Sequence, residues 1–400
     1  MSALPESDWR AHSGLQRIIR TLSDGEVKPL AVGGAVRDSL LGLPVSDVDL
    51  ATALRPDEVI RRLETAGIKA IPTGIAHGTI TAVADGRSFE ITTLRRDVAT
   101  DGRRATVAFS HDWREDAERR DFTMNALYAD IQSGEIFDSV GGLADLDARH
   151  VRFIGDAAQR IAEDYLRILR YYRFLARFGE DHADKEALAA CRDAAPSLKS
   201  LSRERIADEL MKLLATDDPR AAIGHMLSAD IFAHIVSEID GDAAGILDRV
   251  VTREQAHGIA PCAMRRLTAM LPKSPELSGK IASKLRLSKK MQAGLVSRMN
   301  FASLPVDAGA IPAIAYHTSE EAARDIALLF APDSEVAACL TALGNWERPD
   351  FPLKGSDLIA MGLTPGPAVS HTLEAIRAAW IAEGFPDTPR VRALAHEVIG

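Results

Sequence analysis

Residues 30–38 read LAVGGAVRD and residues 46–50 read SDVDL, and these two stretches decide the fold. Residues 30–32 are typical of a short buried strand, and residues 35–41 of a helix, with Gly33 and Gly34 between them. Glycine has no Cβ, so the backbone there can approach an anion closely, and the free N–H groups of a helix start can hold one. The first stretch therefore predicts a strand, a glycine turn and a helix that can hold a phosphate.

The second stretch predicts a strand over residues 45–50, with Asp47 and Asp49 on one face and Val48 and Leu50 on the other. Two adjacent carboxylates repel each other unless a cation lies between them, and Mg²⁺ favours a few carboxylates together with substrate phosphates. Arg37 does not favour the dipole of its helix start, which indicates forked bonding to phosphate instead. Alone, each stretch is an ordinary turn or strand end; together they predict nucleotidyl transfer from a nucleoside triphosphate.

Residues 157–178 predict a single helix, since an apolar stripe follows one side of it: Ile161, Tyr165, Ile168, Tyr172 and Leu175. Asp164 and Arg167 would be neighbours on another face. A carboxylate beside a guanidinium offers acceptors and donors that match the exocyclic amine and ring nitrogen of cytosine or adenine. The alternative is an ordinary ion pair on a helix surface. A row of cations on the same helix favours a phosphate-rich partner: Arg160, Arg167, Arg170, Arg173 and Arg177.

Three further motifs follow in the chain: FEITTLR at residues 89–95, RRDFTMN at residues 119–125 and EDYLR at residues 163–167. The RRD run alone could be a solvated charge run, but Phe122, Met124 and Leu127 anchor it in a core. In this order, the motifs resemble the class II CCA-adding tRNA nucleotidyltransferases and bacterial poly(A) polymerases. The resemblance is clearest over residues 30–214.

The resemblance implies an α+β fold, with a polymerase-β-like nucleotidyltransferase head of mixed sheet and helices followed by an all-helical neck, body and tail. It divides the chain into an N-terminal helix (1–26), the head or palm (27–150), the neck with the template helix (151–216) and the body and tail (217–400). A loop over the site is expected from residue 97 to 111, and its full length favours complete CCA addition.

The resemblance also implies the roles of individual residues. Asp47 and Asp49 would bind the metal, Mg²⁺, and Glu90 would be the third catalytic carboxylate. Gly34 and Arg37 would contact the triphosphate, and Asp164 with Arg167 would select the base. Further nucleotide contacts are expected from Arg120, Asp121, Asn125, Arg170 and Arg173.

The implied activity is template-independent addition of CCA to the 3′ end of tRNA from CTP and ATP, with release of pyrophosphate. The alternatives are a poly(A) polymerase, a CC-only or A-only enzyme, and a non-catalytic nucleotide or tRNA-binding protein. A basic cluster that includes Arg298 is either a solvated helix face or a contact for the tRNA acceptor arm, and its other members are Lys280, Lys284, Arg286, Lys289 and Lys290.

The formal net charge of −9 argues against non-specific coating of RNA, although local basic clusters can coexist with it. Cys191, Cys262 and Cys339 are widely spaced, which favours a reducing cytoplasm over a disulfide framework. We expect no signal peptide and no membrane segment, and no protein partner is evident.

Overall fold

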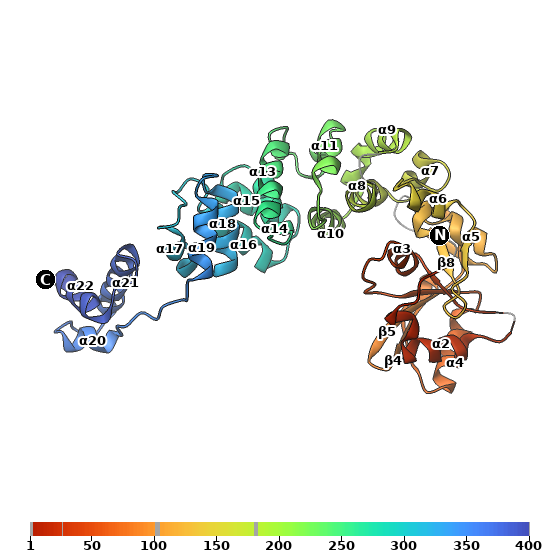
Figure 1. The fold of residues 1–400 in the computed structure, drawn as a ribbon, viewed down its shortest axis with the longest axis horizontal. Coiled ribbons are helices and arrows are strands. Elements are labelled where there is room, and N and C mark those ends of the chain that lie inside the picture. The colour runs from red at the N-terminus through yellow and green to blue at the C-terminus, as the bar shows by residue number, and fades with distance from the viewer. Residues whose placement is uncertain (1–2, 26, 101–104, 180–182, 400) are drawn as a thin grey trace. The chain divides into compact units, whose positions relative to one another are not determined.

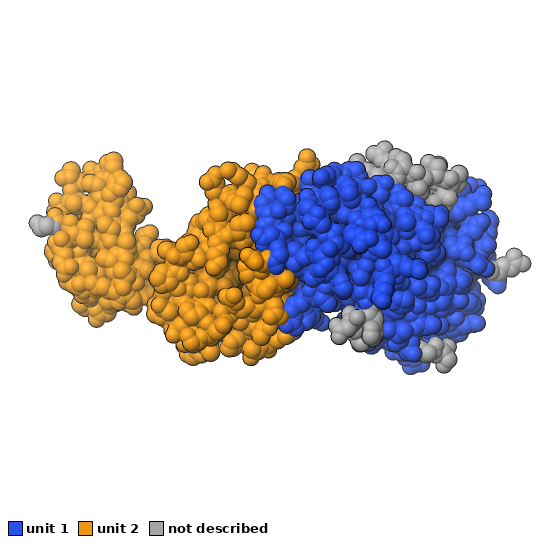
Figure 2. Space-filling model, turned by 90° about the horizontal axis from the view of Figure 1, so that it is seen from above, with its two compact units in different colours: residues 1–241 blue, residues 242–400 orange. Residues whose placement is uncertain are grey.

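The computed structural model describes residues 3–25, 27–100, 105–179 and 183–399. The chain forms two compact units, residues 1–241 and residues 242–400 (Figure 2). The four-part division predicted from the sequence is finer than this split and stays a prediction.

Unit 1 contains a mixed sheet (Figure 1), which in the described ranges has seven strands in the order β3-β4-β5-β2-β1-β8-β9. β2 and β5 are parallel, and the other neighbours are antiparallel. The strands are β1 Leu30–Val32, β2 Asp49–Thr52, β3 Lys69–Gly74, β4 Thr79–Ala84, β5 Arg87–Thr93, β8 Leu127–Ala129 and β9 Ile136–Asp138. With the helices that follow, this sheet confirms the predicted α+β class.

β2 begins at Asp49, so the predicted strand start at residue 45 is wrong. β1 ends at Val32, directly opposite Asp49, because Gly33 turns the chain into a helix. For the residues that precede Asp49, β1 therefore offers no backbone hydrogen-bonding partner. The predicted alternation still holds, since Asp47 and Asp49 are exposed and Val48 is buried.

A separate antiparallel pair, β6 Arg95–Thr100 and β7 Ala105–Phe109, occupies most of the segment expected to be a loop from 97 to 111. Arg95 is opposite Phe109 in this pair. The loop prediction is thus corrected to a hairpin, because the two segments satisfy each other's backbone N–H and C=O groups. Residues 101–104, at the centre of the predicted loop, lie outside the described residues.

A core on one face of the sheet contains Val32, Ala51, Ala117 and Tyr128. Asp49 is opposite Val32 and two residues before Ala51, so its side chain leaves the sheet on this same face. The face thus carries an apolar core at its centre and a carboxylate at its margin.

The helices of unit 1 are α1 Asp8–Ala11, α2 Ser13–Leu22, α3 Gly34–Leu40, α4 Pro56–Thr65, α5 Trp113–Glu118, α6 Gly142–Asp147, α7 Ala157–Glu163, α8 Leu166–Phe178, α9 Lys185–Ala194, α10 Arg203–Leu214, α11 Arg220–Ser228 and α12 Phe232–Ile235, and short 3₁₀ turns cover Ile75–His77, Thr123–Asn125 and Ala195–Ser200. The predicted N-terminal helix is two helices, since His12 has an extended backbone between α1 and α2.

The predicted helix 157–178 is also two helices, because Asp164 is extended (φ −153°, ψ 106°) between α7 and α8. Its Oδ1 accepts the N–H of Leu166 at 3.1 Å. A short aspartate side chain competes with helical hydrogen bonding in this way and favours helix starts over interiors. The break takes Asp164 off the helical face on which it was expected.

In the described residues of unit 2 the regular elements are all helices: α13 Ala243–Ala256, α14 Ala263–Met270, α15 Pro275–Lys284, α16 Lys289–Met299, α17 Ile311–His317, α18 Glu320–Phe330, α19 Val336–Gly344, α20 Gly355–Ala360, α21 Pro367–Ala382 and α22 Thr388–Ile399. Arg298 does not join the exposed basic cluster as predicted. It is buried, and its Nε donates to Asp325 at 2.8 Å, because a buried guanidinium requires a charged partner. Across the described residues, no helix has both the length and the apolarity of a membrane span.

Candidate active site

The parallel pairing of β2 with β5 brings two predicted catalytic carboxylates together. Asp49 is directly opposite Glu90, and both are exposed, whereas their neighbours Leu50 and Ile91 are buried. Asp47, two residues before Asp49, is also exposed and accepts a 2.8 Å hydrogen bond from Ser46. Strands β2 and β5 therefore present Asp49 and Glu90 side by side, and Asp47 lies just before the start of β2.

The electrostatics of this group favour a cation. Partial burial raises the pKa of Asp49, the charges of Glu90 and Asp47 raise it further, and Arg120 opposes them. Among the described residues, no set of three His, Cys, Asp or Glu side chains is arranged as a metal site. The oxygens of Asp47, Asp49 and Glu90 are the donors here that could hold a hard divalent cation with help from a ligand.

The glycine turn begins α3 beside these acids. Gly33 has a positive φ of 69° and donates its N–H to the carbonyl of Leu127 at 3.1 Å. A Cβ there would lie 3.5 Å from the carbonyl oxygen of Asn125 and 3.7 Å from Nη1 of Arg120. Glycine is thus required by the backbone conformation and gives Arg120 close access to the turn.

A cavity of about 400 Å³ opens beside the turn. Its lining is Gly33, Gly34, Arg37, Asp49, Arg119, Arg120, Asp121, Asn125, Asp164, Leu166, Arg167, Arg170, Phe174 and Arg205. Six arginines and three aspartates leave it with an excess of positive charge, which suits a polyanionic ligand.

A chain of hydrogen bonds connects the two helices that border the cavity. On α3, Nη1 of the buried Arg37 donates to Oδ1 of Asn125 at 2.5 Å. The amide of Asn125 donates to Asp121 at 2.9 Å, and Asp121 pairs with Arg170 of α8 at 2.5 Å. Burial opposes ionisation of Asp121, but Arg170 and the hydrogen-bond donors outweigh it and lower its pKa to about 2. Four predicted nucleotide-binding residues therefore form one network.

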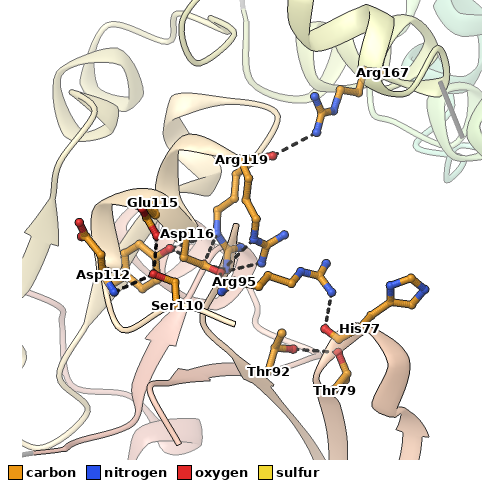
Figure 3. A network of polar contacts seen from close by, with 12 residues as sticks. His77, Thr79, Thr92, Arg95, Ser110, Asp112, Glu115, Asp116, Arg119 and Arg167 are labelled. Atoms are coloured by element: carbon orange, nitrogen blue, oxygen red, sulfur yellow. Dashed lines mark hydrogen bonds and ion pairs between the residues drawn. The ribbon is translucent and has the colours of Figure 1, made fainter. Parts of the chain in front are cut away.

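Arg120 is held from behind the cavity. Its Nη2 lies 3.0 Å from Oδ2 of Asp116, and the hydroxyl of Tyr128 donates to the same oxygen at 2.7 Å. Arg119 binds the other oxygen of Asp116, with 2.9 Å from Nε to Oδ1 (Figure 3). The RRD run is thus an ordered element, and its alternative interpretation as a solvated charge run is wrong.

Asp164 and Arg167 both line the cavity but have separate partners. Oδ2 of Asp164 accepts a 2.7 Å bond from Arg205 of α10. Arg167 binds Glu163 at 2.5 Å and donates to the carbonyl of Arg119 at 3.1 Å (Figure 3). The alternative of a simple ion pair between Asp164 and Arg167 is therefore wrong.

Arg173 is not part of the cavity lining. It pairs with Glu209 at 2.6 Å and lies over the ring of Phe174, 4.7 Å from the centroid. Two lining arginines were missed in the sequence. Arg119 directly precedes Arg120, which was predicted to contact the nucleotide, so its place in the same motif could have indicated it. Nothing in the sequence beyond its place on a predicted helix pointed to Arg205.

The predicted RNA-binding residues Lys280, Lys284, Arg286, Lys289 and Lys290 are all exposed, on α15, on α16 and in the turn between these helices. Lys280 pairs with Glu276 at 2.6 Å. Lys289 and Lys290 begin α16, where a positive charge opposes the helix dipole.

A mixed sheet with paired carboxylates beside an arginine-lined cavity defines a nucleotidyltransferase head. The family model described as the poly A polymerase head domain matches residues 30–152, and that of the probable RNA and SrmB-binding site of polymerase A matches residues 182–242.

Similar proteins extend this likeness over most of the chain. CCA tRNA nucleotidyltransferase 1, mitochondrial, from Mus musculus is 33% identical over 95% of this chain and 89% of its own length. The CCA-adding enzyme of Lacticaseibacillus paracasei is 31% identical over 92% of each. The crystal structure of the Bacillus stearothermophilus CCA-adding enzyme in complex with CTP has a TM-score of 0.74 and 27% identity, covering 92% of this chain and 91% of that one. The chain belongs to the family of class II CCA-adding enzymes and poly(A) polymerases, as the sequence predicted.

Proposed function

We propose that this protein adds CCA to the 3′ end of tRNA, using CTP and ATP and releasing pyrophosphate. One observation carries the proposal: Asp49 and Glu90 lie opposite each other on neighbouring strands, and Asp49 lines a cavity that is also lined by Asp164 and Arg167. The names of the mouse and Lacticaseibacillus relatives and the CTP-bound Bacillus structure support it.

In the proposed reaction the 3′ oxygen of tRNA attacks the α-phosphorus in line. The new O–P bond forms as the bond from the α-phosphorus to the pyrophosphate oxygen breaks. Mg²⁺, when bound by Asp47 and Asp49, would activate the hydroxyl and neutralise the leaving group. The fit is chemical: the donors are carboxylate oxygens, and Mg²⁺ commonly takes one or two of them plus phosphate oxygens.

The other residues would position the nucleotide. Gly34 and Arg37 at the start of α3 would hold the triphosphate, and Arg120 adds a second guanidinium on the same side. Asp121 and Asn125 would orient the ribose through the network that joins them to Arg37 and Arg170. Arg173 would support this group indirectly through Glu209, which it binds at 2.6 Å and which lies 3.8 Å from Arg170.

Base selection would come from Asp164 and Arg167. A guanidinium has five donors, and in the described part of the chain three of those of Arg167 are engaged. The remaining two would donate to a ring nitrogen acceptor, while the carboxylate of Asp164 would accept the exocyclic amine of cytosine or adenine. Uracil and guanine present the opposite pattern and would be rejected.

The exposed basic cluster on α15 and α16 would bind the tRNA acceptor arm. Two lysines in the first turn of α16 are unfavourable for the helix itself, which supports a role with a phosphate partner. For the compartment, we propose the cytoplasm, because all three cysteines are free thiols.

Three tRNA transcripts test the function, ending before CCA, after the first C and after the second C. Each is incubated with protein, Mg²⁺ and labelled CTP or ATP, and the products are resolved at single nucleotides. Extension that stops at CCA is the expected result. A growing ladder of A on any RNA would instead establish a poly(A) polymerase, and stopping after CC or adding only A would identify a partial enzyme. No incorporation would favour a non-catalytic binding protein.

A further inference from the structure

We infer that Asp116 is a positioning residue that fixes the nucleotide-binding arginines without touching the nucleotide itself. The inference rests on the proposed function. Asp116 lies on α5, is 1% exposed and is absent from the lining of the cavity. Its side chain is the centre of the polar network in Figure 3.

Both carboxylate oxygens of Asp116 are engaged. Oδ1 accepts from Nε of Arg119 at 2.9 Å and from the backbone N–H of Arg95 at 3.2 Å. Oδ2 accepts from Nη2 of Arg120 at 3.0 Å and from the Tyr128 hydroxyl at 2.7 Å. Burial opposes ionisation, but Arg120 and Arg119 outweigh it and lower the pKa of Asp116 to about 2. The residue is therefore a fixed negative charge in this network at neutral pH.

This charge holds two adjacent cations in place. Arg119 and Arg120 both line the cavity, and without a shared carboxylate they would repel each other. Arg120 also lies over the ring of Tyr128, 5.4 Å from the centroid, with Asp116 beside that ring. Asp116 thus fixes the position of the Arg120 guanidinium relative to the glycine turn.

The same carboxylate supports the base-selecting side. The backbone carbonyl of Arg119 accepts a 3.1 Å bond from Arg167 (Figure 3). By binding the Arg119 side chain, Asp116 restrains the residue whose backbone carbonyl accepts the hydrogen bond from Arg167. One buried charge therefore serves both the phosphate end and the base end of the nucleotide.

Other acids of α5 have different partners and provide a control. Glu118 pairs with Arg114 on the exposed side of the helix at 2.8 Å. Glu118→Gln removes a charge from the same helix without changing the Asp116 network.

The test measures CTP affinity in the presence of Mg²⁺ and without tRNA, so that it does not depend on turnover. Asp116→Asn keeps the shape and loses the charge, and we expect it to weaken CTP binding at least about tenfold. Combined with Arg120→Ala, the Asp116→Asn change should weaken CTP binding clearly less than it does in the wild type, because the part of its effect that passes through Arg120 is already lost and only the part through Arg119 remains. Glu118→Gln should bind as the wild type does.

Wild-type affinity in Asp116→Asn, or effects that simply add in the double variant, would overturn the inference. If Asp116→Asn does not fold, Tyr128→Phe removes one donor from the same carboxylate, and unchanged CTP binding would then overturn it. Failure of the wild type to extend tRNA would refute the proposed function, whereas the CTP measurements would still decide the role of Asp116.

Discussion

Asp164 and Arg167 are three residues apart, yet the carboxylate of Asp164 binds Arg205 and the guanidinium of Arg167 binds Glu163. The break between α7 and α8 makes this possible, because it moves Asp164 off the helical face of Arg167. Each side chain is oriented by its own partner and keeps hydrogen-bonding capacity for a ligand. Two separate supports should hold the pair more rigidly than a bond between its members.

Arg205→Gln should release the Asp164 carboxylate and impair the binding of both bases. We expect KM for CTP and for ATP to rise about tenfold, because the free energy of binding lost is that of roughly one charged hydrogen bond. Steady-state kinetics measure this, with CTP on a tRNA lacking CCA and with ATP on a tRNA ending in CC. Lys212→Gln is the matched control, since Lys212 is exposed on the same helix and pairs with Asp208 at 2.6 Å. An unchanged KM in the Arg205 variant would refute its role.

Arg167→Ala should blur the choice between CTP and ATP more than it slows the average rate. The variant loses the donors that we propose to face the ring nitrogen, so incorrect bases would no longer be penalised by unpaired groups. Competition between labelled CTP, ATP and UTP on a tRNA ending in CC provides the measurement. Unchanged selectivity would contradict the assignment of this residue to base selection.

Asp47→Ala should abolish incorporation, by about a thousandfold or more, while tRNA binding stays nearly intact. The variant removes a proposed metal ligand, and a bound metal stabilises the charge that develops in the transition state by roughly several kcal/mol. Single-turnover extension and a filter-binding assay measure the two properties separately. Asp57→Asn, at an exposed position of α4, is the control. Parallel loss of tRNA binding would indicate misfolding instead.

Replacing Lys289 and Lys290 with glutamine should weaken tRNA binding and reduce its salt dependence. Each lysine that contacts a phosphate lowers the slope of log K against log salt by about one when it is removed. Affinities measured between low and moderate salt give this slope, and CTP binding should not change. Lys354→Gln, also exposed in unit 2, serves as the comparison. Equal slopes for the variant and wild type would remove these residues from the interface.

Stability should fall as the solution is acidified from about pH 5 towards pH 2. The pKa values of Asp116 and Asp121 are lowered from 3.8 to about 2 in the fold, so folding favours their charged forms. The stabilisation is complete above the unfolded pKa and is lost as pH falls through the folded one, on the order of 2 kcal/mol for each residue. Urea unfolding at several pH values measures it. Asp121→Asn should show a shallower acid dependence, and an identical profile would contradict this source.

Much of the active site could be predicted from local sequence. A glycine pair after a buried strand required a turn, and alternating Asp47 and Asp49 required a common exposed face. The resemblance predicted Glu90 as the third carboxylate, but its position opposite Asp49 could not be predicted, because register depends on pairing between residues forty-one positions apart.

The errors have the same physical origin. Residues 157–178 have the apolar period of one helix, but Asp164 has an extended backbone, accepts the N–H of Leu166 with its side chain and interrupts the helix. Likewise, Arg298 resembles the exposed cations near it, and only its burial against Asp325 distinguishes it.

The sequence by itself determined the family, the α+β class and the residue types of the site, because local motifs and periodicity predict single elements and the motifs taken in order resemble a known family. Only the tertiary structure decided which side chains share a cavity and which partners hold them. Arg205 reaches Asp164 from a helix forty-one residues away, and Asp116 reaches Tyr128 on a strand. Such contacts depend on distances in space that chain order does not encode, since each is formed when separate elements pack around a common core.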